Sequence, residues 1–208
     1  MLKLQKLYKS ETALEILQEA ILSGDVPSGL ELTQTETALS LGVSRMPVRE
    51  ALAALEYCGL VERLPGQHMR VSILDDEIIK SVFQDMALLA TEAIKNFNHE
   101  TRRALSEFEN QNAFHNFLVE NIKSPLRKKF LVIVTEIYLP FVLKNSQGCT
   151  EINDAFKNLR LALEDESENL KASFENYGSI LAEALIKIRR EKKIKNVECQ
   201  TREIIACP

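Results

Sequence analysis

The stretch that decides the fold is Thr33–Gly59, which reads TQTETALSLGVSRMPVREALAALEYCG. Two short helical patterns meet in it at Gly42. The second pattern has the i, i+3, i+4, i+7 spacing of one buried helix face, with apolar residues at Val48, Ala51, Leu52 and Leu55. Arg45, Met46 and Arg49 lie off this stripe in the first two turns. These three side chains are therefore predicted to be available for contacts outside the domain.

This layout is typical of a helix-turn-helix, whose second helix enters the DNA major groove by its N-terminal end. The alternative is a helical hairpin whose two arginines are merely solvated. That alternative does not account for Pro47, which sits where a proline is tolerated because its missing N–H would be unpaired anyway. The first helix of the pair begins at Thr33, a natural N-cap, and Gln34 and Thr35 follow it. Hydroxyl and N–H groups at such a helix start commonly meet phosphates.

The segments on either side complete a small domain. Upstream, Ser10 and Thr12 are expected to cap a helix that ends at Gly24, with an inward stripe at Leu14, Leu17 and Ile21. Downstream, residues 60–64 and 69–73 flank Pro65-Gly66-Gln67-His68 and predict two short strands joined by a tight turn. We interpret this hairpin as a wing. Contact of His68 with DNA and simple exposure in the turn both remain open.

The run LGVSRMPVREAL at 41–52, followed by Leu55, Gly59-Leu60-Val61 and Pro65, resembles the winged-helix domain of the GntR family of bacterial transcription regulators. The family consensus is roughly LGVSRxPVREAL, then Leu, Gly-Leu-Val and a wing, and the match covers about the first third of the chain. The resemblance implies double-stranded DNA as partner. The DNA-binding residues it implies are Thr33, Gln34, Thr35, Ser44, Arg45, Met46, Pro47, Arg49, Gly66, Gln67, His68 and Arg70.

Composition is ordinary for a globular chain of 208 residues, with 45% hydrophobic and 27% charged residues. The formal net charge is −4, which argues against a protein that coats nucleic acid non-specifically. Residues 1–74 carry seven Lys/Arg and nine Asp/Glu, so DNA affinity must come from local placement of charge and from dimerisation. The four cysteines are scattered, with no CxxC pair, and the N-terminus lacks a signal-peptide core. We therefore expect a cytoplasmic protein.

From Asp75 onward every segment predicts helix, and no strand pattern follows Ile73. The expected helices span roughly 77–97, 99–109, 111–122, 125–146, 151–164 and 166–194. The most apolar run, residues 130–143, is too short for a membrane span and is interrupted by Pro140. We expect a kinked core helix that also contributes to a dimer face. The predicted fold is mainly α: a winged helix-turn-helix over residues 1–74, then an all-α bundle over 75–208 for effector binding and dimerisation.

A winged helix followed by such a bundle resembles the FadR branch of the GntR family, whose FCD domain binds a small effector. Many FCD domains hold a divalent metal through one Asp and three His. Here Phe114-His115 matches the family pattern, but the Asp position is Gln111, and the other two histidines fall near Ala155 or Phe156 and at about Tyr177. The resemblance therefore implies no metal or other cofactor in this chain, and an effector that is not gripped through a metal. The candidate pocket residues are Gln111, His115, Asn158 and Tyr177.

The resulting hypothesis is a homodimeric regulator of a palindromic operator, modulated by a small-molecule effector. In the alternative, the helical domain is only a dimerisation module and binds no effector. An enzyme is the rival from another class, but the chain has no nucleophile elbow, phosphate-cradling glycine loop or HExxH motif. The cationic stretch 187–195 is expected to end the last helix through the macrodipole. Its alternative role is a set of sequence-independent DNA contacts.

Overall fold

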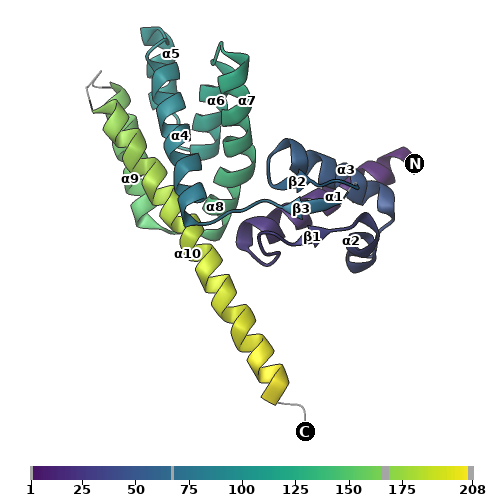
Figure 1. The fold of residues 1–208 in the computed structure, drawn as a ribbon. Helices are drawn as coiled ribbons and strands as arrows, with labels where there is room; N and C mark the ends of the chain where they lie inside the picture. The colour runs from purple at the N-terminus through teal and green to yellow at the C-terminus, as the bar shows by residue number, and fades with distance from the viewer. Residues whose placement is uncertain (1, 67, 165–168, 206–208) are drawn as a thin grey trace. The chain divides into compact units, whose positions relative to one another are not determined.

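The computed structural model describes the backbone of residues 2–66, 68–164 and 169–205. The chain forms two compact units, which we call the winged unit (residues 1–74 and 188–208) and the bundle unit (residues 75–187). Helices dominate both units, and the described residues contain one small sheet (Figure 1). The predicted fold class, a winged helix-turn-helix followed by a helical bundle, is confirmed.

Three helices build the body of the winged unit: α1 (Leu2–Ser23), α2 (Gln34–Leu41) and α3 (Arg45–Tyr57). α1 and α3 pack together through buried apolar side chains, which are Ala13, Leu17 and Ile21 from α1 and Val48, Ala51, Leu52 and Leu55 from α3. The predicted buried stripe of α3 is confirmed. The predicted helix start at Ser10 or Thr12 is wrong, because α1 already begins at Leu2 and both residues lie inside it.

The turn between α2 and α3 fixes the direction in which α3 leaves the body. The Thr33 hydroxyl caps α2, accepting from the Glu36 N–H at 3.2 Å and donating to the Glu36 carboxylate at 2.8 Å. α2 ends at Gly42, whose φ of 64° lies in the left-handed region that a Cβ disfavours. The Val43 N–H then donates to the Ala38 carbonyl at 3.0 Å. The helix-turn-helix predicted from the sequence is therefore present.

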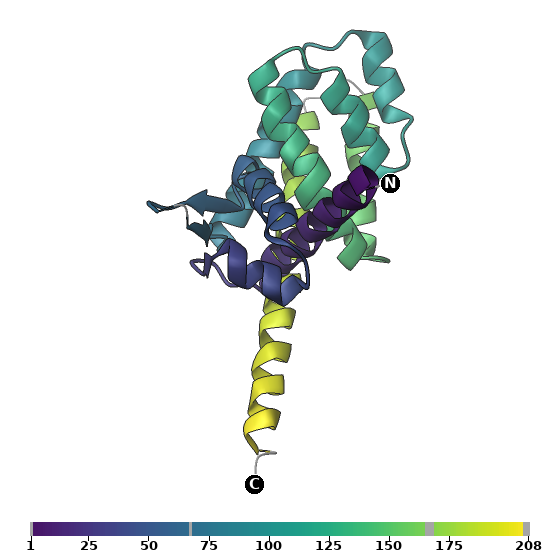
Figure 2. The same ribbon diagram turned by 90° about the vertical axis from the view of Figure 1, so that its right-hand side faces the viewer.

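The wing is a three-stranded antiparallel sheet in the order β1-β3-β2. Its strands are β1 (Glu31–Leu32), β2 (Val61–Arg63) and β3 (Met69–Val71). The β2–β3 hairpin confirms the prediction, and Figure 2 shows it projecting beyond α1, α2 and α3. β1 has no counterpart among the predicted strands, since two residues are too few for an alternating pattern. It pairs Leu32 with Met69 and thereby ties the connector before α2 to the wing.

In the residues that the structure describes, the bundle unit consists of seven helical elements and the first half of α10. These elements are α4 (Asp76–Ile94), α5 (His99–Ser106), α6 (Gln111–Glu120), α7 (Pro125–Ile133), η1 (Val134–Tyr138), α8 (Leu139–Asn145) and α9 (Thr150–Glu164). Four large rings that are fully buried lie in its core: Phe83, Phe114, Phe174 and Tyr177. α10 approaches α4 closely at Gly178, where an added Cβ would lie 2.8 Å from the Phe83 carbonyl oxygen.

The helix predicted over 125–146 is interrupted by η1, a widened π-helical turn just before Pro140. Proline donates no N–H, and its ring crowds the carbonyl four residues earlier, here that of Glu136. The π turn therefore falls where a regular α-helix would be strained. None of the described helices combines the length and the apolar character needed to cross a lipid bilayer.

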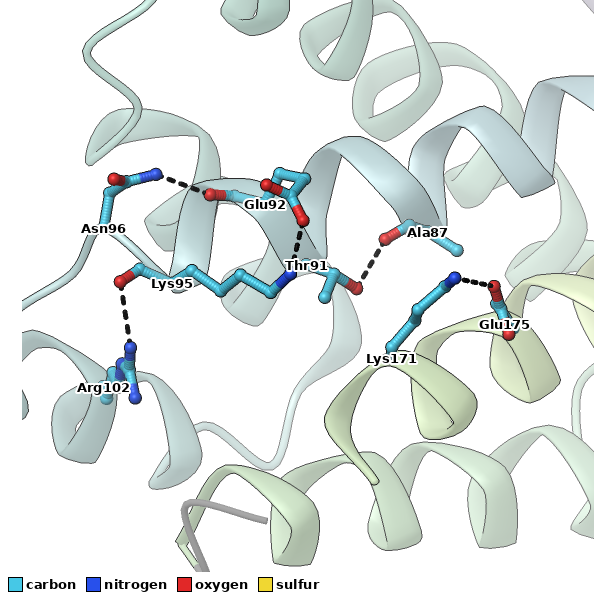
Figure 3. A network of polar contacts seen from close by, with 8 residues as sticks. All are labelled: Ala87, Thr91, Glu92, Lys95, Asn96, Arg102, Lys171 and Glu175. Carbon is cyan, nitrogen blue, oxygen red and sulfur yellow. Dashed lines mark hydrogen bonds and ion pairs between the residues drawn. The ribbon is translucent and has the colours of Figure 1, made fainter. Parts of the chain in front are cut away.

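Arginines satisfy carbonyl groups at several helix ends. Arg102 donates to the Ile94 and Lys95 carbonyls at 3.1 Å each and so closes the C-terminus of α4. Figure 3 shows the Lys95 contact beside the Asn96 amide, which donates to the Glu92 carbonyl at 2.7 Å. These bonds supply partners that the last turn of a helix lacks. The two Arg102 bonds connect α5 to the end of α4.

The last helix, α10 (Leu170–Ile205), continues past the predicted end at residue 194. Its predicted start at 166 lies outside the described residues. Because the cations of 187–195 lie inside the helix, they do not end it through the macrodipole as expected. Arg189 instead serves another helix and donates to the Ile21 and Leu22 carbonyls of α1 at 2.7 and 2.8 Å.

Candidate DNA-binding surface

The leading end of α3 is exposed and its rear face is buried. Arg45, Met46 and Arg49 are exposed, whereas Val48 is fully buried. Ser44 is the N-cap, yet its side chain makes no capping hydrogen bond. Its exposed hydroxyl is therefore available to an external partner. The N-cap and first two turns of α3 thus present two guanidinium groups, a hydroxyl and a thioether.

Four cations lie between residues 12 and 74, and two of them are held by glutamates. Arg63 forms a two-pronged ion pair with Glu56, and its hydrogen bonds hold the pKa of the Glu56 carboxyl below its ordinary value. Arg70 donates to Glu62 at 2.8 Å. Arg45 and Arg49 make no hydrogen bond or ion pair with another described residue. An anionic partner can therefore bind these two arginines without competing with a glutamate.

The start of α2 offers a second group of polar side chains. Thr35 is exposed, and Thr33 and Gln34 are partly exposed. The Thr33 hydroxyl is already engaged with Glu36. Gln34 and Thr35 are therefore the freer candidates for phosphate contacts at this helix start.

The wing contributes Gly66 and His68, both exposed at the tip of the β2–β3 hairpin. Arg70 is half-buried on β3 and paired with Glu62, so an external partner would have to compete for it. Gln67 lies outside the described residues. Pro47 differs from the other candidates because it is buried on the inner side of α3. Its place is in the packing of the first turn.

In the bundle unit, three of the four candidate pocket residues come together. The Tyr177 hydroxyl donates to Gln111 Oε1 at 2.7 Å, and the Tyr177 and His115 rings stack with centroids 5.8 Å apart. Gln111 also donates to Asn153 Oδ1 at 3.2 Å. No local sequence pattern points to Asn153, which is 42 residues away in the chain. Asn158 is exposed on α9 and does not join this group.

The residues around His115 do not fit a divalent metal. Burial lowers the pKa of His115 to about 4, and its Nε2 has no hydrogen-bond partner among the described residues. Its ring neighbours are Phe114 and Tyr177, and an amide at Gln111 replaces the carboxylate. In the described part of the chain, His, Cys, Asp and Glu side chains nowhere gather in threes as metal ligands would.

These features define a winged helix-turn-helix DNA-binding domain. They are a second helix with one buried face and unpaired arginines at its N-terminal end, a glycine turn before it, and a short projecting sheet. Residues 9–71 match the model for bacterial regulatory proteins of the gntR family. This region, about a third of the chain, is therefore similar to the DNA-binding domain of GntR regulators. The matching model describes regulatory proteins, in agreement with the expectation of a regulator rather than an enzyme.

Two curated relatives match part of the chain. An uncharacterised HTH-type transcriptional regulator of Agrobacterium vitis is 33% identical over 72 residues, which cover 35% of this chain and 42% of the relative. One from an unstable DNA locus of Streptomyces ambofaciens is 41% identical over 59 residues, covering 28% and 25%. The aligned stretch thus spans less than half the length of either relative.

Solved structures extend the likeness to most of the chain. Lar, described as controlling expression of the Listeria monocytogenes agr system, gives a TM-score of 0.55 at 18% identity and covers 87% of this chain and 96% of its own. A GntR transcriptional regulator from Rhodococcus sp. RHA1 gives 0.50 at 16% identity, covering 87% and 97%. At these identities the likeness concerns the fold, a winged helix followed by a helical bundle. That is the architecture implied by the resemblance to the FadR branch.

Proposed function

We propose that the protein is a cytoplasmic, sequence-specific transcription regulator that inserts the leading end of α3 into the DNA major groove. The observation that carries this proposal is the exposure of Arg45 and Arg49 on that end, without ion pairs to other described residues. In this role the two guanidinium groups contact base edges or phosphates. Ser44 and Met46 add contacts in the groove, and Gln34 and Thr35 contact the backbone.

The wing is proposed to add contacts beside the groove through Gly66, Gln67, His68 and Arg70. Charge supports DNA as the partner of the whole winged unit. Residues 188–208 carry six Lys/Arg and three Asp/Glu, which changes the net charge of this unit from −2 for residues 1–74 alone to +1. The excess is small, so sequence-independent attraction to phosphates contributes little. Specific contacts and avidity must supply most of the affinity.

We further propose that the protein acts as a homodimer on a palindromic operator. The two winged units of a dimer bind neighbouring half-sites with an avidity that neither winged unit has alone. The test is sedimentation of the protein with and without DNA, followed by selection of bound duplexes from a random library. A dimer and a selected inverted repeat support the proposal, whereas a monomer that enriches no sequence refutes it.

The effector role is proposed for the group formed by Gln111, His115 and Tyr177. It is supported by the buried Nε2 of His115, since a buried polar atom without a partner calls for an explanation such as a bound molecule. An effector would shift populations between arrangements of different operator affinity. If the bundle is only a dimerisation module, a thermal-shift screen with metabolites will find no compound that stabilises the protein.

A further inference from the structure

The bundle unit contains a cavity of about 290 Å³ that opens where three segments meet. These segments are the start of α6, the end of α8 with its following turn, and the start of α9. The volume lies at the small end of the range for ligand pockets, which is about 300–1,000 Å³. It therefore suits a compact molecule with few heavy atoms.

Carboxamide groups dominate the wall of this cavity. Five of the eleven lining residues are Asn or Gln: Asn110, Gln111, Asn112, Gln147 and Asn153. Ser146 adds a hydroxyl, Glu109 is the one acidic side chain, and the lining contains no Lys, Arg or His. An amide offers both donors and acceptors, as does a hydroxyl group of a ligand. A ligand carboxylate would find no cationic side chain here.

Most of these amides have hydrogen-bonding capacity left. Asn112 and Gln147 are exposed, and their side-chain amides make no hydrogen bond with another described residue. Asn110 uses its Oδ1 to accept from the Ala113 N–H, and no described residue accepts from its Nδ2. The wall can therefore donate and accept without first breaking an internal bond.

One amide connects the cavity to the core. Gln111 bridges Asn153 at the cavity wall and the hydroxyl of Tyr177, which is fully buried on α10. The Gln111 oxygen accepts from Tyr177 and keeps a second lone pair, which a ligand hydroxyl in the pocket can use as an acceptor. The same helix, α10, contributes residues 188–205 to the winged unit.

We propose that this amide-lined pocket is the effector site and that it takes a small, neutral, hydroxyl-rich molecule of the monosaccharide or polyol class. This inference rests on the proposed function of an effector-modulated regulator and specifies its ligand. Gln111 belongs both to the pocket and to the core group of His115 and Tyr177. Binding of a ligand in the pocket is therefore transmitted to the core through the hydrogen bond between Gln111 and Tyr177.

The test is calorimetric titration of the full-length protein with matched neutral and anionic probes. D-glucose, D-xylose and myo-inositol are the neutral probes, and D-gluconate and D-glucuronate are their carboxylate counterparts. At least one neutral probe is expected to bind, with the anions at least tenfold weaker. Asn112→Ala and Gln147→Ala should each weaken that binding at least tenfold. Asn116→Ala, an exposed amide one turn further along α6 and outside the pocket, is the matched control.

Three results would overturn the proposal: no binding of any neutral probe, tighter binding of the anions, or unchanged affinity in both pocket variants. DNA binding is measured separately by gel shift of the same ligand-free protein. A ligand-site failure thus leaves the DNA-binding proposal standing, and a gel-shift failure leaves the ligand result intact.

Discussion

The guanidinium group of Arg189 donates to the carbonyl oxygen of Ile21 at 2.7 Å, although the two residues are 168 positions apart in the chain. A second bond reaches the carbonyl of Leu22 at 2.8 Å. Both acceptors belong to the last turn of α1, where carbonyls lack partners and the helix dipole favours a cation. Arg189, in the middle of α10, therefore supplies partners to the last turn of the helix that packs against α3.

Replacing Arg189 with alanine should destabilise the winged unit by about 1–2 kcal/mol, because two charge-assisted hydrogen bonds to partly buried carbonyls are lost. Arg189→Lys should recover only part of this, since an ammonium lacks the planar fork of the guanidinium. Urea denaturation and hydrogen exchange at the end of α1 measure the effect. Lys193→Ala, an exposed cation on the same helix, is the control. Equal stability of the Arg189→Ala and Lys193→Ala proteins would show that the two hydrogen bonds from Arg189 to α1 do not stabilise the unit.

The buried imidazole of His115 makes stability depend on pH. Burial lowers the pKa of His115 to about 4, from 6.5 in the unfolded chain. Between these values the unfolded state binds the extra proton, so stability is fully present above pH 6.5 and falls as the pH is lowered toward 4. The loss attributable to this group is on the order of 3 kcal/mol.

Comparing the wild type with His115→Phe isolates this contribution from that of the carboxylates. The difference in unfolding free energy between the two proteins should change between pH 6.5 and 4. If the difference in unfolding free energy between wild type and His115→Phe does not change with pH, the imidazole is not buried as a neutral group.

Gly178→Ala should destabilise the bundle unit by about 1–3 kcal/mol through overpacking. The new methyl group would lie 2.8 Å from the Phe83 carbonyl oxygen, which is backbone and cannot move aside easily. In a helix without this contact, the same change would stabilise by about 1 kcal/mol. A lower melting temperature for Gly178→Ala therefore supports the close contact, and a higher one contradicts it. Ser179→Ala, at the exposed neighbouring position, should leave the temperature nearly unchanged.

Local signals were sufficient to predict the helix-turn-helix, because each of its parts is encoded within a few residues. Thr33 caps one helix, Gly42 ends it in a left-handed conformation, and the apolar spacing from Val48 to Leu55 buries one face of the next. The wing hairpin follows from alternating residues around Pro65-Gly66. These elements form by short-range rules, so the sequence pattern predicts them directly.

The features that sequence patterns did not predict depend on contacts between distant residues. β1 exists because Glu31 and Leu32 find Arg70 and Met69 as partners. The amide-lined pocket brings Asn112 together with Gln147, and no periodicity links these positions. The burial of Pro47 and the exposure of Asn158 follow from the rotation of each helix against its neighbours. Resemblance to a family suggests roles for such residues but does not determine which way they face.

The most direct test of the account is the affinity of Arg45→Ala and Arg49→Ala for a selected operator duplex, measured by fluorescence anisotropy at several salt concentrations. Loss of a bidentate contact to a base costs about 1–3 kcal/mol, so at least one variant should bind roughly 5- to 150-fold more weakly. Arg103→Ala, which removes an exposed arginine from the bundle unit, should bind like the wild type. Unchanged affinity in both α3 variants would contradict the assignment of this helix as the DNA-reading element.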